Sequence, residues 1–212
     1  MTLADALPAL PLDAYRGPTL EVARWLIGKM LWSRIDGELT GGIIVETEAY
    51  VASVDPAAHG YRGETPRTRS MFGPPGHAYV YVSYGLHHCL NVVTEPAGEA
   101  AAVLLRALEP RAGLDIMRNR RGEHCHDRDL CRGPGRLCQA LGITLREDGA
   151  PLSGPDLWIA EASQGHQWAV ATSRRIGISR AVEWPWRFFV PGSQFVSRGM
   201  PRGARPDESA VQ

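Results

Sequence analysis

The sequence predicts an α+β fold in which one mostly antiparallel β-sheet is surrounded by helices. Two observations predict it: β-rich runs follow one another across short Asp-, Gly- and Pro-containing turns, and short helical segments interrupt them. The 212 residues, 44% of them hydrophobic, can bury one sizeable core. Because no internal repeat and no linker divides the chain, we predict a single domain.

The first half of the chain is expected to hold one helix and two hairpins. Pro18 near the start and Gly28 past the end delimit the helix. Asp36-Gly37 between two apolar runs is a strong hairpin signal, and Gly85-Leu86 indicates a second tight turn. The predicted elements are a helix at 18–28, a hairpin joining 30–35 to 41–50, a hairpin joining 77–84 to 87–93, and a strand at 101–108.

The second half is expected to combine helices with short strands. Glu109-Pro110 is expected to open a helix that includes Leu114 and Met117. The other elements predicted there are a helix at 135–142 and strands at 157–160 and 187–190. In the first half, residues 51–76 are predicted to form a long loop that is either functional or disordered. The domain is predicted at 15–199, between an N-terminal extension at 1–14 and a disordered tail at 200–212.

Charge is balanced over the whole chain but uneven along it. The 23 basic and 23 acidic side chains cancel, although Lys29 is the only lysine among the basic ones. Residues 60–136 and 172–212 are net positive and could together form a positive face for a polyanion. A Lys-poor proteome would produce the same Arg-rich composition, so the count alone assigns no function.

Several features predict a cytoplasmic protein that has no membrane partner. No apolar run approaches the roughly 18 residues of a membrane helix. The N-terminus has no basic segment before its apolar residues, as an export signal would. The 4 cysteines are too few for a disulfide scaffold in a chain of this length.

Motifs for several chemistries are absent. The chain has no phosphate-binding P-loop, no Gly-x-Gly-x-x-Gly after a strand and no Gly-x-Ser-x-Gly. The segment His124-Cys125-His126, with Cys131 and Cys138, follows no common zinc spacing. We therefore predict no metal and no cofactor. An imine mechanism would have to use Lys29 or the N-terminal amine.

Glu46 and Glu48 alternate on a predicted strand and so share one face, with Cα atoms about 6.7 Å apart. This spacing fits two solvated glutamates, and it also fits the carboxylate pair of a sugar hydrolase that inverts configuration. Arg106 lies inside an apolar strand, where an unpaired charge is very costly. We expect Arg106 to pair with a carboxylate, and Glu48 is a candidate.

Tyrosines gather near these residues. Tyr50 follows Glu48 by two positions, and the second hairpin carries Tyr79, Tyr81 and Tyr84. Tyrosines are ordinary strand residues and could form only a packed face. Tyr84, however, stands beside the hairpin tip, where it is poorly placed to reach a core and well placed to wedge between stacked bases.

With these residues assembled, the sequence resembles the alkyladenine (3-methyladenine) DNA glycosylase family of the mammalian type over residues 15–199. Order and spacing are kept across all the matching blocks. These are VETEAY (45–50), DPAAHG (55–60), TPRTRSMF (65–72), PGHAYVYVSYG (75–85), Cys89-Leu90-Asn91, VLLRALEP (103–110), DLCRGPGRLCQALGI (129–143) and RRIGI (174–178).

The resemblance implies a fold and a set of residue roles. The fold would be a curved antiparallel sheet with a protruding β-hairpin, similar to the C-terminal domain of formyltransferases. Glu48 would be the general base that activates a water molecule. Arg106 and the main-chain carbonyl of Ile176 would help to hold that water. The remaining roles would be a base pocket of Tyr50, His59, Tyr81 and Asn91, the intercalating Tyr84, and weaker DNA contacts from Arg67, Arg69, Leu86 and His87.

The resemblance further implies a monofunctional enzyme that acts as a monomer on double-stranded DNA. It would flip out damaged purines such as 3-methyladenine, 7-methylguanine, hypoxanthine and ethenoadenine, hydrolyse the N-glycosidic bond and leave an abasic site. In a bacterium it would be associated with the nucleoid. Two alternatives remain open at this point: a non-catalytic nucleic-acid-binding module of the same fold, and a sugar hydrolase that uses Glu46 and Glu48.

Overall fold

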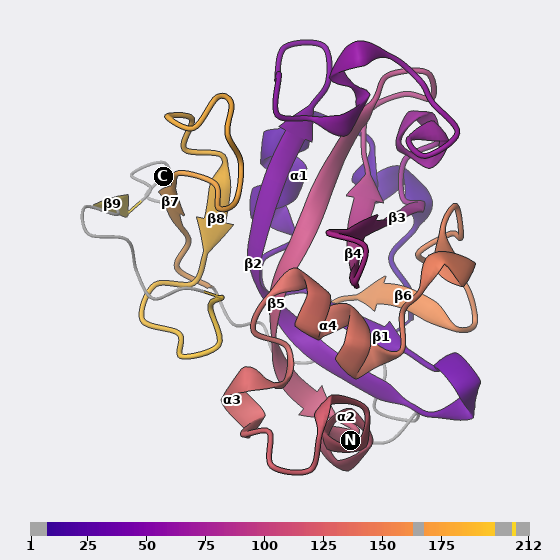
Figure 1. Ribbon diagram of the computed structural model, residues 1–212, viewed down its shortest axis with the longest axis vertical. Coiled ribbons are helices and arrows are strands. Elements are labelled where there is room, and N and C mark those ends of the chain that lie inside the picture. Colours follow the sequence, from indigo (N-terminus) through magenta and orange to yellow (C-terminus); the bar gives the residue numbers. More distant parts are fainter. Residues whose placement is uncertain (1–7, 163–167, 198–204, 207–212) are drawn as a thin grey trace.

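The computed structural model describes residues 8–162, 168–197 and 205–206, whose strands form one 9-stranded sheet (Figure 1). The α+β class and the antiparallel pairing are confirmed. The strands are β1 (Met30–Ser33), β2 (Thr40–Val51), β3 (Ala78–Ser83), β4 (His87–Val93), β5 (Ala101–Ala112), β6 (Leu157–Ala160), β7 (Ala171–Ser173), β8 (Arg187–Phe189) and β9 (Arg205–Pro206). Their order is β3-β4-β5-β2-β8-β7-β9, and β1 pairs with β2 and β6.

Alternation along the strands gives the sheet two different faces: the face that carries Glu46, Glu48 and Arg106 is named the polar face, and the opposite face is named the apolar face. On the apolar face, Ala49 of β2, Val103 and Leu105 of β5, and Leu90 and Val92 of β4 belong to the main core. The helices that contribute to that core are α1 (Thr19–Trp25), α2 (Leu114–Arg121), α3 (Asp127–Leu130) and α4 (Pro134–Leu141). The polar face of β2 to β5 carries Glu48, Asn91 and Arg106 beside a smaller apolar cluster that includes Val93 and Ala102.

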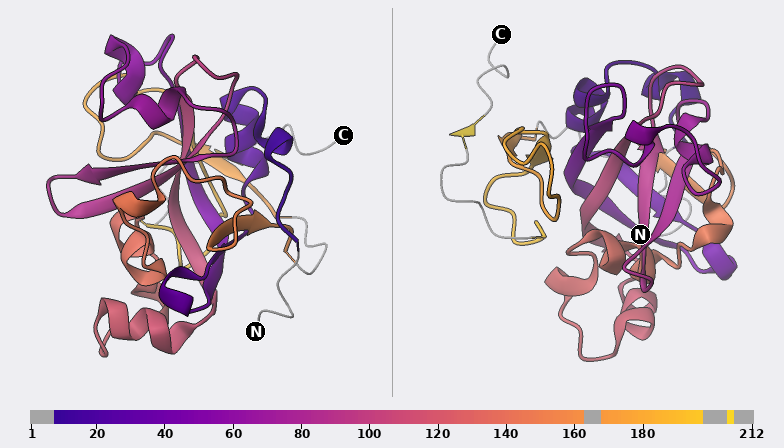
Figure 2. Two further views of the ribbon diagram at one scale, coloured as in Figure 1. Left: turned by 90° about the vertical axis from the view of Figure 1, so that its right-hand side faces the viewer. Right: turned by 45° about the horizontal axis from the view of Figure 1, so that its top comes forward.

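Both predicted hairpins are present, and each turn uses positive φ angles. Asp36 and Gly37 have φ of 56° and 77°, as an Asp-Gly turn between β1 and β2 requires. Tyr84 and Gly85 have φ of 51° and 71°, and they join β3 to β4. The β3–β4 hairpin extends away from the body of the molecule (Figure 2, left).

The prediction that a helix begins at Glu109-Pro110 is wrong, because β5 continues to Ala112 and α2 begins only at Leu114. Pro110 is tolerated in the strand because β4 pairs with β5 only between Ala102 and Leu104. The register of β2 also shifts next to Gly42, the partner of Pro110.

The long segment 51–76 contains no strand beyond Val51, the last residue of β2, and two 3₁₀ helices, η4 (His59–Arg62) and η5 (Arg69–Phe72), give it regular structure. Asp55 and Met71 within it are buried. The segment is therefore part of the packed molecule, which removes the disordered option. The strand β7 and the helix α3 were not predicted from the sequence. Two further 3₁₀ helices, η2 (Leu12–Tyr15) and η3 (Ile35–Gly37), precede β2.

The two ends of the predicted domain fall partly outside the described residues. Near the N-terminus, Ala9 bridges to Ala160 and Leu10 reaches the core, so packing begins before residue 15. Of the tail predicted at 200–212, the structure describes only Arg205–Pro206, which pairs with β7. Within the described residues, no helix is long and apolar enough to cross a membrane.

Candidate active site

A pocket of about 510 Å³ opens on the polar face of the sheet. Its walls come from β2, β3, β4 and β5, from the segment 56–71, and from the segment 176–180. Tyr50, His59, Tyr81, Asn91, Arg106 and Ile176 line this pocket. The structure thus brings six of the seven residues predicted for catalysis or base binding to one cavity, although they come from six separate stretches of the chain.

Glu48, the seventh residue, is fully buried immediately behind the pocket wall. Its Oε1 accepts a hydrogen bond from the backbone N–H of Ile176 at 2.7 Å. Its Oε2 accepts from Tyr50 Oη at 2.9 Å and from Arg106 Nη1 at 3.2 Å. All three donors line the pocket, so this carboxylate lies next to the cavity and is held by donors on both oxygens.

The predicted pairing of Arg106 with a carboxylate is confirmed, and it involves both glutamates. Arg106 Nε donates to Glu46 Oε1 at 3.0 Å while Nη1 donates to Glu48. Glu46 also accepts from Arg187 Nε at 2.7 Å and from the backbone N–H of Ser197 at 2.6 Å. The two carboxylates therefore share a face of β2, as the alternation predicts, and neither is solvated.

Burial and pairing act differently on the two glutamates. For Glu48, burial is the largest influence and raises the pKa, and Arg106, the Ile176 amide and Tyr50 oppose it only in part. For Glu46, burial also raises the pKa, but the combined effect of Arg106, Arg187 and Ser197 is larger and the pKa is lowered. Glu48 is consequently the better proton acceptor, and Glu46 is a fixed anion.

Aromatic rings form one wall of the pocket. The ring of Tyr81 packs edge-on against His59 with centroids 4.5 Å apart, and Tyr79 lies 5.5 Å from Tyr81. His59 Nδ1 hydrogen-bonds Tyr79 Oη at 2.9 Å, which fixes the imidazole. Burial and then the charge of Arg67 lower the pKa of His59, so its ring is neutral at pH 7.

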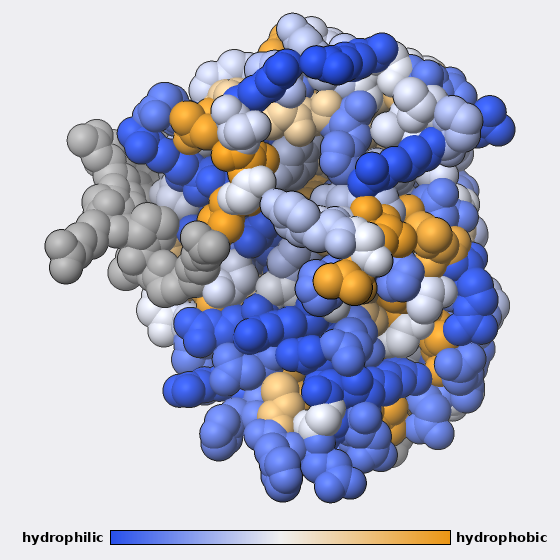
Figure 3. Space-filling model, in the orientation of Figure 1, coloured by the Kyte–Doolittle hydropathy of each residue, from blue (hydrophilic) through white to orange (hydrophobic). Residues whose placement is uncertain are grey.

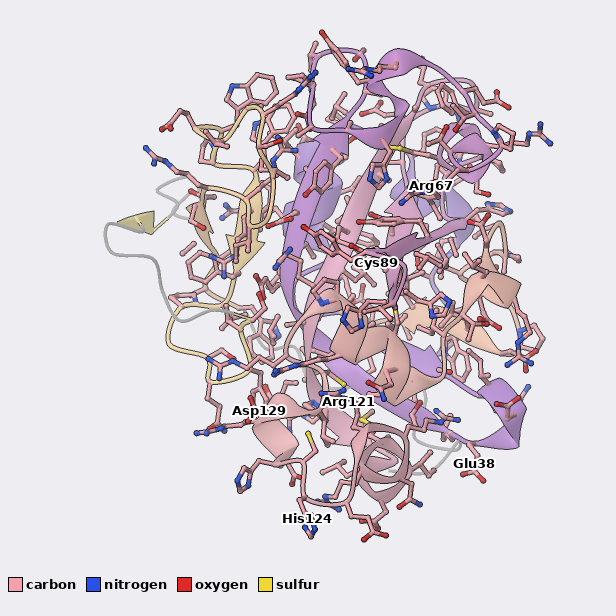
Figure 4. The ribbon with its side chains drawn as sticks, viewed as in Figure 1. Glu38, Arg67, Cys89, Arg121, His124 and Asp129 are labelled. Atoms are coloured by element: carbon pink, nitrogen blue, oxygen red, sulfur yellow. The ribbon has the colours of Figure 1, made fainter. Side chains whose placement is uncertain are left out.

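Two polar groups complete the inner wall. Asn91 Nδ2 donates to the carbonyl of Tyr79 at 2.9 Å, which orients the amide between β3 and β4. Cys89, a register partner of Tyr81, lines the same wall and is buried. Burial raises the pKa of the Cys89 thiol, so it is protonated. Figure 4 shows Cys89 and Arg67 in the part of the molecule that holds the pocket.

The tip of the β3–β4 hairpin carries two large exposed side chains. Tyr84 is 89% exposed and Leu86 78% exposed, so neither packs into the core. Tyr84 also borders the pocket. Next to the tip, Gly135 of α4 approaches His87 so closely that a Cβ would lie 2.8 Å from the His87 Cβ, which places this helix against the tip end of the hairpin.

The two arginines predicted to contact DNA are in different situations. Arg67 lines the pocket, donates to the carbonyl of Val82 at 2.9 Å and lies over the Tyr81 ring at 5.7 Å. Arg69 is exposed and paired with Glu64 at 3.2 Å. Only Arg67 therefore stands at the pocket itself.

The main chain of Ile176 was expected to act through its carbonyl. The structure brings its N–H group to Glu48 instead, so the observed contact of this residue is a donor to the carboxylate. The role of the carbonyl stays a prediction.

Sequence reasoning missed a second buried ion pair behind Tyr50. Arg175 forms a two-point salt bridge with Asp55, donates to the carbonyl of Ala49 at 2.9 Å, and lies over the rings of Tyr50 at 4.5 Å and Trp186 at 5.3 Å. The pair ties the segment 51–62 to the segment 174–180. The blocks DPAAHG and RRIGI contain both residues, but nothing local in either block predicts the pairing.

Arg187, which also pairs with Glu46, was missed although a signal for it exists. It stands in the apolar run RFFV, where the argument used for Arg106 applies equally.

The His- and Cys-containing segment plays no part in the pocket. His124 lies at the end of the molecule away from Arg67 and Cys89 (Figure 4). Cys131 and Cys138 are buried in the core. In the part of the chain that the structure describes, no group of three or more His, Cys, Asp or Glu side chains could hold a metal ion.

Comparison with known proteins assigns the chain to a class of nucleobase-excising enzymes. The model of the family described as "Methylpurine-DNA glycosylase (MPG)" matches residues 13–194. The chain belongs to this family, and it is a DNA glycosylase, a hydrolase of DNA repair whose substrate is DNA.

Curated relatives agree over most of their length. A protein of Agrobacterium fabrum named "Putative 3-methyladenine DNA glycosylase" is 50% identical over 191 residues, 90% of this chain and 93% of the relative. A protein of Chlorobaculum parvum with the same name is 48% identical, covering 89% of this chain and 90% of the relative. One of Rhodopseudomonas palustris, named likewise, is 52% identical over 86% of this chain and 84% of the relative.

Proposed function

We propose that this enzyme removes damaged purines from double-stranded DNA by hydrolysis, with Glu48 as the general base, and leaves an abasic site. The observation that carries the proposal is a buried carboxylate whose three hydrogen-bond donors all line an aromatic pocket. The names of the relatives support 3-methyladenine as one substrate. Alkylated purines that carry a positive charge are the class that suits this pocket best.

The electrostatics of the walls support that choice. The negative faces of Tyr50 and Tyr81 attract a flat cation stacked on them. Because the pKa of His59 is lowered, its neutral ring does not repel such a base, and it can hydrogen-bond to the purine edge. Asn91, held by Tyr79, would form the side wall and disfavour purines whose exocyclic amine points at it.

The chemistry requires one base and one water molecule. Water attacks C1′ of the deoxyribose, Glu48 takes its proton, and the C1′–N bond breaks with its electron pair leaving on the purine. A purine alkylated at N3 or N7 departs as a neutral molecule, because its positive charge is cancelled by that electron pair. A neutral lesion such as hypoxanthine needs a proton as it leaves, which water or a pocket group would supply.

The exposed hairpin tip suits the step that precedes chemistry. A base inside a duplex must be flipped out, which costs a few kcal/mol and least for damaged or mispaired bases. Tyr84, exposed and bordering the pocket, would fill the space that the base leaves. Pocket and wedge come from one chain, so a monomer suffices. Its DNA substrate would bring the enzyme to the nucleoid in a bacterial cell.

The geometry does not favour either alternative, the sugar hydrolase or the non-catalytic nucleic-acid-binding module. A two-carboxylate sugar hydrolase needs a second carboxylate free to act, whereas Glu46 accepts hydrogen bonds from Arg106, Arg187 and Ser197 and is fully buried. A non-catalytic binding module would not need a buried carboxylate of raised pKa beside its pocket.

Replacement of the proposed base is the direct test. Glu48→Gln keeps a hydrogen-bond acceptor but cannot take a proton, so we expect single-turnover release of 7-methylguanine and hypoxanthine from a duplex to fall at least about a hundredfold. Binding of the lesion duplex should persist. Glu38→Gln, an exposed change of the same chemistry, is the control and should behave as the wild type. Normal turnover by Glu48→Gln would disprove the mechanism.

A further inference from the structure

Arg106 divides its guanidinium among three acceptors, and only one nitrogen reaches the proposed base. Nε donates to Glu46 at 3.0 Å, Nη1 to Glu48 at 3.2 Å, and Nη2 to Ser197 Oγ at 3.2 Å. The bond to Glu48 is thus single. An Arg beside a carboxylate commonly forms two parallel bonds instead, which is the stronger arrangement.

Glu46 accepts the Nε–H bond of Arg106, and Glu46 is itself held by several other donors. Arg187 Nε donates to Glu46 at 2.7 Å, and Ser197 donates to it through its backbone N–H at 2.6 Å and through Oγ at 2.8 Å. The Arg187 and Glu46 side chains are fully buried, so these contacts do not exchange with water at the surface. Two carboxylates and two guanidinium groups therefore balance in one cluster.

We propose that Glu46 is a positioning residue for the reaction: it holds Arg106 to a single bond with Glu48 and so leaves Glu48 a stronger base. This inference rests on the proposed function of Glu48. Without the charge of Glu46, the Nε and Nη1 groups of Arg106 could both turn to Glu48. A carboxylate that accepts two bonds from a guanidinium binds a proton more weakly, and it would accept one from water less readily.

The groups that face Glu48 come from every element packed around it. They are Arg106 on β5, Tyr50 and Glu46 on β2, the Ile176 N–H, Tyr81 on β3, and Arg187 on β8, which is the register partner of Glu48. Of these, Glu46 and Arg187 touch no pocket surface. Substituting either one therefore alters the charge around Glu48 without removing a group that meets the substrate.

The two substitutions have opposite expected effects. Glu46→Gln frees Arg106 for Glu48 and removes a neighbouring negative charge, so the acidic limb of the rate profile moves to lower pH. Arg187→Gln removes a positive charge near Glu48 and leaves Glu46 to hold Arg106 more tightly, so the acidic limb moves to higher pH. If Glu46 and Arg187 only maintained the fold, their substitutions would not move the acidic limb in opposite directions.

The experiment measures single-turnover excision of 7-methylguanine from a duplex as a function of pH. This purine is already cationic, so its departure needs no acid and the acidic limb reports the base. We expect Glu46→Gln to lower the plateau rate about tenfold and to move the limb down. The dissociation constant for lesion DNA should stay within about twofold of the wild-type value, because no phosphate or base contact is removed.

Ser197→Ala keeps the inference testable if Glu46→Gln does not fold. It removes the acceptor of Arg106 Nη2 and so frees that group to turn toward Glu48, while Arg187 and the backbone N–H of Ser197 still hold Glu46, so a smaller shift of the limb to lower pH is expected. An acidic limb that stays at the wild-type pH in both variants would overturn the inference, as would a shift in the same direction in Arg187→Gln. Normal turnover by Glu48→Gln in this assay would instead overturn the proposed function, and the inference with it.

Discussion

Two glutamates separated by one residue on β2 show how surroundings decide what a side chain does. Both are buried and both contact Arg106. Glu46 has a second arginine and two donors from Ser197, and its pKa is lowered. Glu48 has one arginine bond, and burial raises its pKa. The same residue type is thus held as an anion at one position and has a raised pKa at the next position on that face, where we propose the general base.

The difference predicts unequal effects of the two substitutions on stability. Since its folded pKa is lowered, the ionised form of Glu46 stabilises the fold above the ordinary glutamate pKa, and this contribution is lost as pH falls through the folded pKa. Glu46→Gln leaves two buried arginines with too little negative charge, and we expect a loss of about 3 kcal/mol, roughly 10 °C in Tm.

Glu48→Gln is the matched comparison. Because the folded pKa of Glu48 is raised, its ionised form costs stability as pH rises through that value, and a neutral amide removes this cost. We expect its Tm at pH 7 to stay within a few degrees of the wild-type Tm, as measured by calorimetry. Equal losses in the two variants would contradict the assigned difference between the carboxylates.

At the scale of elements, alternation on the strands separates stability from chemistry. Neighbouring residues such as Thr47 and Glu48 point to opposite faces: Thr47 Oγ1 donates to the carbonyl of Ala23 in α1, while Glu48 lies behind the pocket. The β3–β4 hairpin extends this polar face to a tip whose Tyr84 and Leu86 side chains are exposed. These two side chains are thus free to contact a partner.

That arrangement predicts a substitution that affects DNA and leaves folding intact. Tyr84→Ala removes an 89% exposed ring, so Tm should change little. The single-turnover rate on a lesion in a duplex should fall about tenfold, and less on a single-stranded lesion, which needs no wedge. Leu145→Ala, which removes an exposed apolar side chain from the 3₁₀ helix η6 (Leu145–Glu147), is the control. An unchanged duplex rate would show that Tyr84 does not act as a wedge.

At the scale of the whole molecule, the zero net charge conceals an uneven surface. Hydrophilic side chains cover the face over α2 to α4 (Figure 3). Arg128, Arg132 and Arg136 there surround Asp129, and Arg118 is paired with Asp115 and Asp127. Many of the arginines are therefore partly neutralised by acidic neighbours, which limits how many phosphates the enzyme can contact.

The salt dependence of DNA binding should reflect this limit. Each phosphate neutralised contributes about −0.9 to the slope of log affinity against log salt concentration, so we expect a slope that corresponds to fewer than about ten phosphates. Titration of a lesion duplex by fluorescence anisotropy at several salt concentrations measures it. A slope corresponding to ten or more phosphates would mean that the acidic partners yield their arginines to DNA.

The sequence by itself determined the local parts of this protein. β-rich runs between turn signals placed the strands, Asp36-Gly37 and Gly85-Leu86 placed the hairpins, and the cost of a lone charge in β5 predicted a partner for Arg106. Each of these depends on residues within a few positions. The prediction of a helix that starts at Glu109-Pro110 was wrong, because the conformation of this segment depends on which strands lie beside β5.

Only the tertiary structure decided which distant groups meet. Arg187 is 141 residues from Glu46, Ile176 is 128 from Glu48, and Arg175 is 120 from Asp55. No local pattern encodes such pairs, because many buried carboxylates could satisfy a given arginine and only the packing of the sheet selects one. The sequence thus determined that a buried charge needs a partner, and the fold decided which partner it has and how strong a base Glu48 remains.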